Sequence, residues 1–205
     1  MGELQLAIFQ IVVLIFSAVI HEVSHGAVAN HLGDPTAKDL GRLTLNPVKH
    51  LELFGSIILP VLLYLSKVGF IFGWAKPVPY NPANLKDPRW GSAWIALAGP
   101  AANLAVALVL GLIIRFASIP DPFFVAMLEI VVFINILLAV FNLVPIPPLD
   151  GSKLLFSALG ERAEGFQRMF EQNGLIVLLL FIFFGFTLIL PIIYFLFWAI
   201  TGNAF

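Results

Sequence analysis

Five long apolar segments constrain the fold of this chain more than any other feature. They cover about residues 4–29, 53–72, 92–117, 123–144 and 175–200. Each approaches or exceeds the roughly 20 residues that a helix needs to cross about 30 Å of hydrocarbon. Only 11% of the residues are charged, against about 25% in soluble domains. The sequence therefore predicts an all-α polytopic membrane protein.

The segments differ in the roles that we expect of them. We predict a three-helix core over 4–29, 92–117 and 123–144, and a C-terminal transmembrane helix over 175–200. Residues 152–172 have the amphipathic spacing of a helix on the membrane surface. The 205 residues suit a single integral membrane domain, residues 1–205, with no room for a separate soluble module.

Two polar connections have the pattern of short strands. Leu43–Leu45 lies between turn residues, and Gly73–Tyr80 has the composition of an extended segment. Pro77 and Pro79 cannot donate to a ladder, which restricts the second stretch to an edge. We therefore expect a short membrane-associated strand region beside the helices.

The first apolar segment contains the motif His21-Glu22-Val23-Ser24-His25. On a helix, residues four apart share a face, so both imidazoles can bind one metal ion while Glu22 stands beside them. The chain has no cysteine, so nitrogen and oxygen atoms are the ligands that remain. The pattern indicates a zinc hydrolase site within a membrane.

A hydrolytic zinc site usually takes three protein ligands and leaves a fourth position for water. Several acids and histidines lie in the polar connections, but Asp150 stands out among them. It ends the run from Asn142 to Gly151, in which successive prolines stop a helix and the chain can turn back. Asp150 is therefore the candidate third ligand.

Three motifs together resemble the site-2 protease family of intramembrane zinc metalloproteases. They are the HExxH sequence, Gly99-Pro100-Ala101-Ala102-Asn103 at the opening of a middle helix, and Asn142 to Gly151. The resemblance implies one Zn²⁺ per chain, bound by His21, His25 and Asp150. It further implies Glu22 as general base and Asn142 as a contact to substrate or oxyanion. We interpret Asn103 as a packing residue.

Shared ligation also constrains topology. The histidines lie near the end of the first segment and Asp150 just beyond the fourth, so these two helices must run parallel. Two apolar segments intervene, one more than this parallel arrangement allows. Leu53–Phe72 is therefore predicted to be re-entrant, with a full transmembrane crossing as the alternative. The basic residues then gather on one face, which places the N-terminus outside and the active site nearer the cytoplasm. We expect the protein to lie in a prokaryotic cell membrane.

The expected function is hydrolysis of peptide bonds in or near transmembrane segments of membrane-anchored substrate proteins. A helical substrate must first unwind, and Gly73–Tyr80 is our candidate for pairing with it by strand addition. A membrane metal-ion transporter or a metal-binding protein is the alternative, and the same ligand types also hold non-haem iron. A net charge of -1 argues against nucleic acid as partner. The sequence indicates no oligomeric state.

Overall fold

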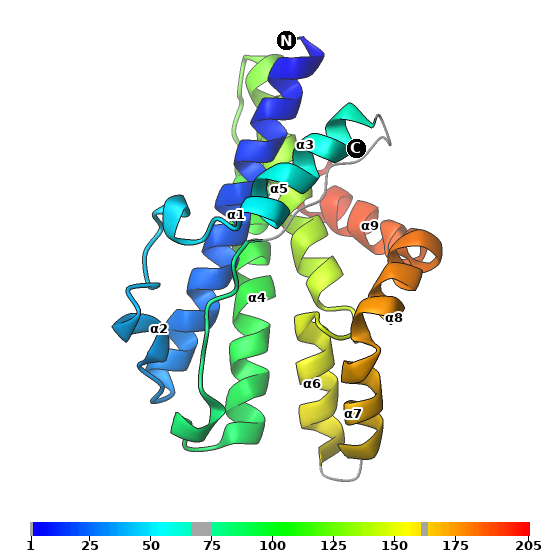
Figure 1. The fold of residues 1–205 in the computed structure, drawn as a ribbon. Coiled ribbons are helices and arrows are strands. Elements are labelled where there is room, and N and C mark those ends of the chain that lie inside the picture. The colour runs from blue at the N-terminus through cyan, green and yellow to red at the C-terminus, as the bar shows by residue number, and fades with distance from the viewer. Residues whose placement is uncertain (1, 67–74, 161–163) are drawn as a thin grey trace.

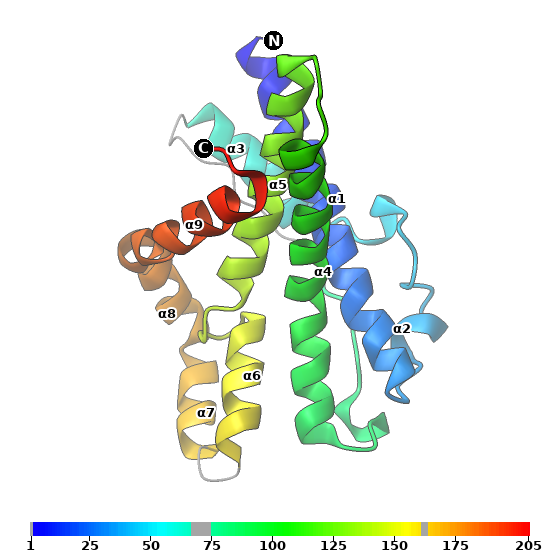
Figure 2. The ribbon, with the colours of Figure 1, turned by 180° about the vertical axis from the view of Figure 1, so that it is seen from behind.

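Three long helices form the centre of the molecule. The computed structural model describes residues 2–66, 75–160 and 164–205. Its core consists of α1 (Glu3–His31), α4 (Pro88–Phe116) and α5 (Pro122–Asn142), all long and apolar enough to cross a membrane. As Figures 1 and 2 show, α1 and α5 run in one direction and α4 runs in the other. The parallel arrangement expected from shared ligation is thus confirmed.

Shorter elements surround this core. They are α2 (Thr36–Asp39), η1 (Pro47–Lys49), η2 (Leu53–Ile58), α3 (Leu59–Leu65), η3 (Pro82–Asn84), α6 (Asp150–Leu159), α7 (Glu164–Gln172), α8 (Gly174–Leu180), η5 (Phe181–Gly185), η6 (Phe186–Leu188) and α9 (Leu190–Thr201). Every regular element within the described ranges is helical, so the all-α class is confirmed.

The starts of the two later core helices are visible in the sequence. Asp87 precedes Pro88, and its side chain accepts a hydrogen bond from the backbone N–H of Trp90. Asp121 precedes Pro122 and accepts from the backbone N–H of Phe123 in the same way. An acidic cap satisfies a free N–H at the helix end, and proline has no N–H to leave unsatisfied there.

The predicted strand region is wrong for the residues that the structure describes. Leu43–Leu45 lies in a loop, and the described part of the second stretch, residues 75–80, is extended but belongs to no ladder. Its backbone N–H groups explain this, because Lys76 donates to the carbonyl of His50 and Val78 donates to Glu22. Gly73 and Trp74 of that prediction lie outside the described residues.

The segment predicted to be re-entrant contains only a short helical stretch. The π-helix η2 continues directly into α3, and together they cover Leu53–Leu65. At 1.5 Å per residue, these 13 residues reach about 20 Å, which is less than the hydrocarbon thickness. Residues 67–72 lie outside the described ranges, so the re-entrant path stays a prediction.

The C-terminal apolar segment is broken rather than straight. Residues 175–200 divide among α8, η5, η6 and α9, and α9 returns to pack against α4 and α5. Ile193 and Phe197 of α9 are completely buried in that contact. The amphipathic stretch likewise divides into α6 and α7, which lie side by side at the lower end of the molecule (Figure 1). Whether 175–200 crosses the membrane stays a prediction.

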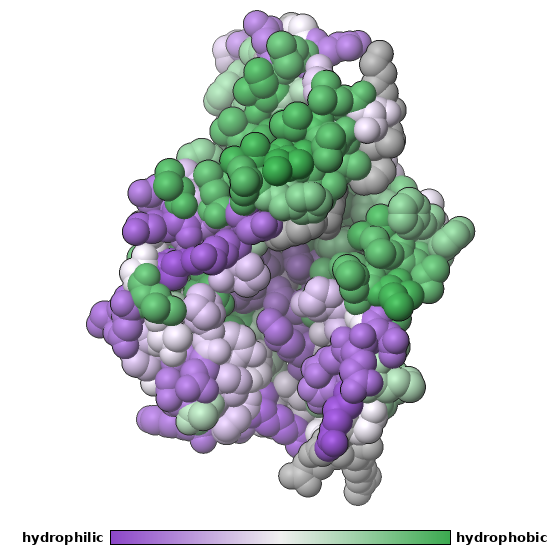
Figure 3. Space-filling model, in the orientation of Figure 1, coloured by the Kyte–Doolittle hydropathy of each residue, from purple (hydrophilic) through white to green (hydrophobic). Residues whose placement is uncertain are grey.

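Hydropathy is distributed unequally along the molecule. In the view of Figure 3, apolar residues gather over its upper part and polar residues over the lower part. The first half of α1 and the short helix α3 lie in the upper part, and α2 and α6 lie in the lower part.

Candidate metal centre

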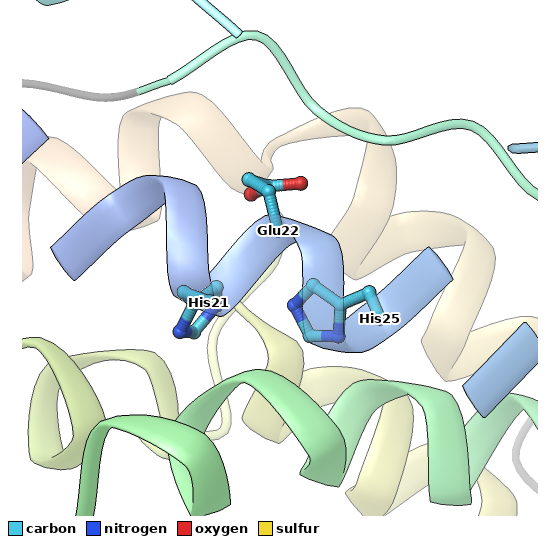
Figure 4. Close-up of side chains that lie close together, drawn as sticks. All are labelled: His21, Glu22 and His25. Carbon is cyan, nitrogen blue, oxygen red and sulfur yellow. The ribbon is translucent and has the colours of Figure 1, made fainter. Parts of the chain in front are cut away.

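The two motif histidines point away from α1 toward α4. Figure 4 shows both imidazoles on this side and the Glu22 carboxylate on the side of the extended segment. His21 and His25 are buried, with 6% and 7% of their surface exposed. Their ring centroids lie 4.6 Å apart. The helical spacing of the motif thus places both rings in the gap between two core helices.

Asp150 reaches this gap from the first turn of α6. Its Oδ2 lies 3.1 Å from Nε2 of His21 and 3.1 Å from Nε2 of His25. Gly151 allows the approach, because a Cβ there would collide with the carbonyl oxygen of Leu143. The proline run therefore delivers the carboxylate to the histidines, as the sequence predicted.

The surroundings of Asp150 favour its charged form. Burial raises the pKa of this carboxyl, but hydrogen bonds from His21 and His25 and the charge of Lys153 outweigh that cost. The pKa consequently lies well below its usual range. Lys153 Nζ lies 3.3 Å from Oδ1, which leaves Oδ2 facing the histidines. The carboxylate is thus an anionic donor with one oxygen directed at the two rings.

Backbone geometry fixes the hydrogen positions on His25. Its Nδ1 lies 2.6 Å from the carbonyl oxygen of Ile95, which can only accept, so Nδ1 carries the hydrogen. His21 has a corresponding partner, since its Nδ1 lies 2.7 Å from Oδ1 of Asn103. With hydrogen on Nδ1, each neutral ring has its Nε2 lone pair available for a metal ion held between the ring and Asp150, whereas without an ion a protonated Nε2 donates the hydrogen bond to Asp150. An Nδ1–H bonded to an acceptor behind the ring is the arrangement that metal-ligating histidines usually have.

The donor set fits a zinc ion. Zinc bonds of about 2.0–2.1 Å in a tetrahedron place the ligand atoms about 3.3 Å apart. The observed distances of 3.1 Å between Asp150 Oδ2 and each Nε2 are close to that edge length. Two imidazoles and one carboxylate are also a set that hydrolytic zinc sites use. These three side chains could therefore hold one zinc ion.

Glu22 stands beside the donor set rather than within it. One of its carboxylate oxygens and a ring nitrogen of each histidine lie within 4.8 Å of one another. However, Oε2 accepts a hydrogen bond of 2.8 Å from the backbone N–H of Val78. Asp150 lies closer to both Nε2 atoms, so it completes the set better than Glu22 does. The position of Glu22 suits a proton acceptor near a bound water.

The Gly99 motif contacts the centre directly. A Cβ at Gly99 would lie 2.5 Å from Nε2 of His21 and 2.6 Å from Cε1 of His25, so only glycine lets α4 approach this closely. The motif does not open its helix, as the sequence suggested, because α4 begins eleven residues earlier at Pro88. Asn103, interpreted as a packing residue, is bonded to His21.

Asn142 has a different environment from the one that its proposed role suggests. It is the last residue of α5, and its Nδ2 donates to the carbonyl of Leu138 in the same helix. Its contact to substrate or oxyanion stays a prediction. Asn135, one heptad earlier, is almost completely buried and bonds to Asn103. A polar residue in so apolar a helix is itself a sequence signal of a functional or structural role, although no motif includes Asn135.

The extended segment is held by side chains that no motif indicated. The buried Asp34 accepts from the backbone N–H of Asn81 at 2.7 Å and from Nδ2 of Asn84 at 2.7 Å. Arg42 donates to the carbonyl of Lys76 at 2.9 Å. The segment is thus anchored before and after Val78, and the N–H of Val78 is presented to Glu22.

A helical membrane protein with a buried His-His-Asp centre beside a glutamate belongs to the class of membrane metallopeptidases. The model of peptidase family M50, the site-2 protease family, matches residues 9–121 and 115–186. The chain belongs to this family, which confirms the resemblance seen in its motifs.

Two curated relatives are similar over much of the chain. "Putative zinc metalloprotease YwhC" of Bacillus subtilis is 35% identical over 188 residues, which cover 86% of this chain and 80% of the relative. "Putative zinc metalloprotease Rip2" of Mycolicibacterium smegmatis is 37% identical over 139 residues, which cover 67% of this chain and 52% of the relative. No solved structure matches the chain.

Proposed function

We propose that the chain is an intramembrane metalloprotease that binds one zinc ion and cleaves peptide bonds in or near transmembrane segments of its substrates. His21, His25 and Asp150 are the ligands, and Glu22 is the general base. The observation that carries the proposal is the distance of 3.1 Å from Asp150 Oδ2 to each Nε2. Ligands from α1 and α6 thereby meet between helices long enough to cross a membrane.

The residues of the centre divide the chemistry between them. A bound zinc ion would supply an acidified water and polarise the peptide carbonyl. Glu22 takes a proton from the attacking water as the water oxygen bonds to the carbonyl carbon. It then gives the proton to the leaving amine as the carbon–nitrogen bond breaks. Val78 N–H donates to Oε2 of Glu22, and Oε1 is the oxygen proposed to accept the proton.

The substrate is a transmembrane or membrane-anchored protein. A narrow apolar recess of about 10 Å³ borders α1 on the side of Glu22. Ile11, Ile15 and Ala18 line it, and Ala18 lies one turn before Glu22. The apolar surface around this recess is proposed to contact an unwound apolar stretch of substrate. Asn142 is proposed to contact it, and residues 75–80 to lie beside it.

The strand addition expected at the extended segment does not fit the hydrogen bonds found there. Pairing requires free N–H groups at alternate positions, but Lys76 and Val78 donate elsewhere and Pro77 and Pro79 have none. A substrate therefore meets carbonyl groups and side chains of this segment rather than a free edge.

The centre is proposed to lie nearer the cytoplasmic side of a prokaryotic cell membrane, with the N-terminus outside.

The decisive experiment uses Glu22→Gln in purified protein loaded with zinc, with a reporter transmembrane substrate. We expect the variant to bind one zinc ion per chain and to lose cleavage, since an amide cannot accept the proton. A chelator should abolish cleavage by the wild type, and added zinc should restore it. Full cleavage by Glu22→Gln would contradict the proposed mechanism. Zinc flux into vesicles with no cleavage would instead indicate a transporter.

A further inference from the structure

A chain of buried amides connects α5 to the centre. Asn103 of α4 is completely buried and Asn135 of α5 is 1% exposed. Asn103 donates to the backbone carbonyl of Ser17 in α1 and Asn135 donates to the Ser17 Oγ, so these three residues join all three core helices. Within the described residues, the hydrogen bonds of Asn135 go to Asn103, Ser17 and Val131 and not to the proposed ligands. Its connection to the centre runs through Asn103.

Two backbone carbonyls, which can only accept hydrogen bonds, determine how these amides are oriented. Asn135 Nδ2 donates to the carbonyl of Val131 at 2.8 Å, and a carbonyl can only accept. The nitrogen of this amide must therefore face Val131, and the same nitrogen donates to Ser17 Oγ at 2.9 Å. Its Oδ1 consequently faces Asn103, from which it accepts a hydrogen bond of 2.8 Å.

The orientation of Asn103 follows in the same way. Its Nδ2 donates to the carbonyl of Ser17 at 3.1 Å as well as to Asn135. Its Oδ1 must then face Nδ1 of His21, at 2.7 Å, and can only accept from it. Reversing this amide would break bonds to two acceptors in a buried site, each worth about 1–3 kcal/mol when left unsatisfied.

We propose that Asn135 is a positioning residue for the metal centre. Through Asn103, it keeps the hydrogen of His21 on Nδ1 and the lone pair of Nε2 directed at the ion. This rests on the assignment of His21 as a ligand in the proposed function. Partners behind a metal-bound histidine typically contribute 10- to 100-fold in metal affinity. Asn135 acts one step further away, and we expect it to contribute about tenfold.

The test compares zinc dissociation constants, measured against a competing chelator, in four proteins. Asn135→Leu removes the amide and should weaken zinc binding about tenfold. Asn135→Asp, uncharged at this buried position, keeps a carbonyl for Asn103 and a hydroxyl donor for Ser17 or Val131. It should bind zinc within about twofold of the wild type. The absorption spectrum of bound Co²⁺ should shift in the Leu variant only.

Asn203→Leu is the matched control. Asn203 Nδ2 donates to Glu129 Oε1 at 2.8 Å, so this variant also removes a side-chain bond to α5, but one far from the ligands. Because this bond is exposed, the variant should change thermal stability little and leave zinc affinity unchanged. Zinc affinity of the wild-type value in Asn135→Leu would overturn the proposal. Equal loss in Asn135→Asp would overturn it too, because packing rather than hydrogen bonding would then matter.

Zinc binding by the wild type and by Asn135→Leu separates the positioning role of Asn135 from the proposed function. If the wild type binds no zinc, the proposed function fails, and this inference fails with it. If the wild type binds zinc and cleaves, but Asn135→Leu binds zinc normally, only the positioning role fails. Because the measured quantity is zinc affinity, the same comparison can be made in the Glu22→Gln background, where cleavage is expected to be absent.

Discussion

The two sides of α1 face regions that are built on different principles. On the side of His21 and His25, side chains from packed helices meet one another, and the contacts join α4 and α6. On the side of Glu22, a single extended segment lies over the helix. It is held there by bonds between side chains and the main chain, including Val78 N–H to Glu22.

The geometry of the two regions therefore depends on different interactions. The ligand region depends on how closely helices approach, so a single added carbon atom can destroy it. The extended segment depends on hydrogen bonds that are individually modest, each worth about 0.5–1.5 kcal/mol net. Damage to the first region should therefore abolish metal binding, whereas damage to the second should reduce turnover and leave the metal in place.

The largest effect is expected at Gly99. In Gly99→Ala the new Cβ would lie 2.5 Å from Nε2 of His21, so either the ring or α4 must shift. Zinc affinity should fall by about 100-fold or more, the upper end for loss of support around a ligand. Titration against a chelator measures it.

Gly111→Ala provides the control for that prediction within the same helix. A Cβ there would collide with the Ile200 side chain, far from the ligands. This variant should lower the melting temperature and keep the zinc affinity of the wild type. Equal zinc affinity in the two glycine variants would refute the idea that helix approach sets the ligand geometry.

Asp34 should produce the second largest effect, on stability. It is completely buried and accepts from Thr36 Oγ1 at 2.5 Å, from Asn81 N–H and from Asn84. Every partner donates, so Asp34→Asn turns an amide NH₂ toward other donors. The free energy of unfolding should fall by about 1–3 kcal/mol. Asp39→Asn, in the exposed part of α2, should change it little.

The pH dependence of that difference follows from the direction of the Asp34 pKa. Burial raises this pKa, but hydrogen bonds from Thr36, Asn84 and Asn81 outweigh it, and the pKa is lowered from its usual value. A carboxyl with a lowered pKa stabilises the fold above its ordinary pKa near 4 and loses this contribution as the pH falls below it. The gap between wild type and Asp34→Asn should thus stay constant from pH 8 to 5 and shrink below about pH 4. A gap that widens in acid would contradict this.

The same contrast explains what the sequence could and could not predict. The HExxH spacing and the proline run before Asp150 are local patterns, and the structure brings Oδ2 of Asp150 to 3.1 Å from Nε2 of each motif histidine. Helix boundaries and the parallel run of α1 and α5 followed from apolar length and shared ligation. The exact start of α4 did not, because its first turn, Pro88–Gly91, precedes the apolar segment from which the helix was predicted to begin at 92.

Long-range polar contacts could not be predicted from the residues. The partner of Glu22 is a backbone N–H 56 positions away, and an N–H has no sequence signature. The strand prediction failed for the same reason, since the pattern of Lys76 to Tyr80 shows extended backbone but not where its hydrogen bonds go. Asn135 was visible as a polar residue in an apolar helix, but its partner was not.

A smaller effect is expected when the Val78 N–H is removed. Val78 precedes Pro79, which favours the extended conformations that proline also adopts, so Val78→Pro removes the donor with little change of path. Glu22 then loses its fixed orientation, and kcat should fall about tenfold, equivalent to about 1.4 kcal/mol. Zinc affinity should not change. Val78→Ala keeps the N–H, and a kcat as low as that of Val78→Pro would show that the side chain matters instead.

The smallest effect is expected at Lys153, which contacts both regions. Its Nζ lies 3.3 Å from Asp150 Oδ1 and 5.7 Å from the centre of the Tyr80 ring. Because its side chain is 40% exposed, solvent screens this ion pair, and Lys153→Met should weaken zinc binding only two- to fivefold. Val78 acts on Glu22 and not on the ligands, so adding Val78→Pro should leave the zinc affinity of Lys153→Met unchanged. A further loss in the double variant would show that the two sides of α1 are coupled through Lys153, and that the separation between metal binding and turnover is incomplete.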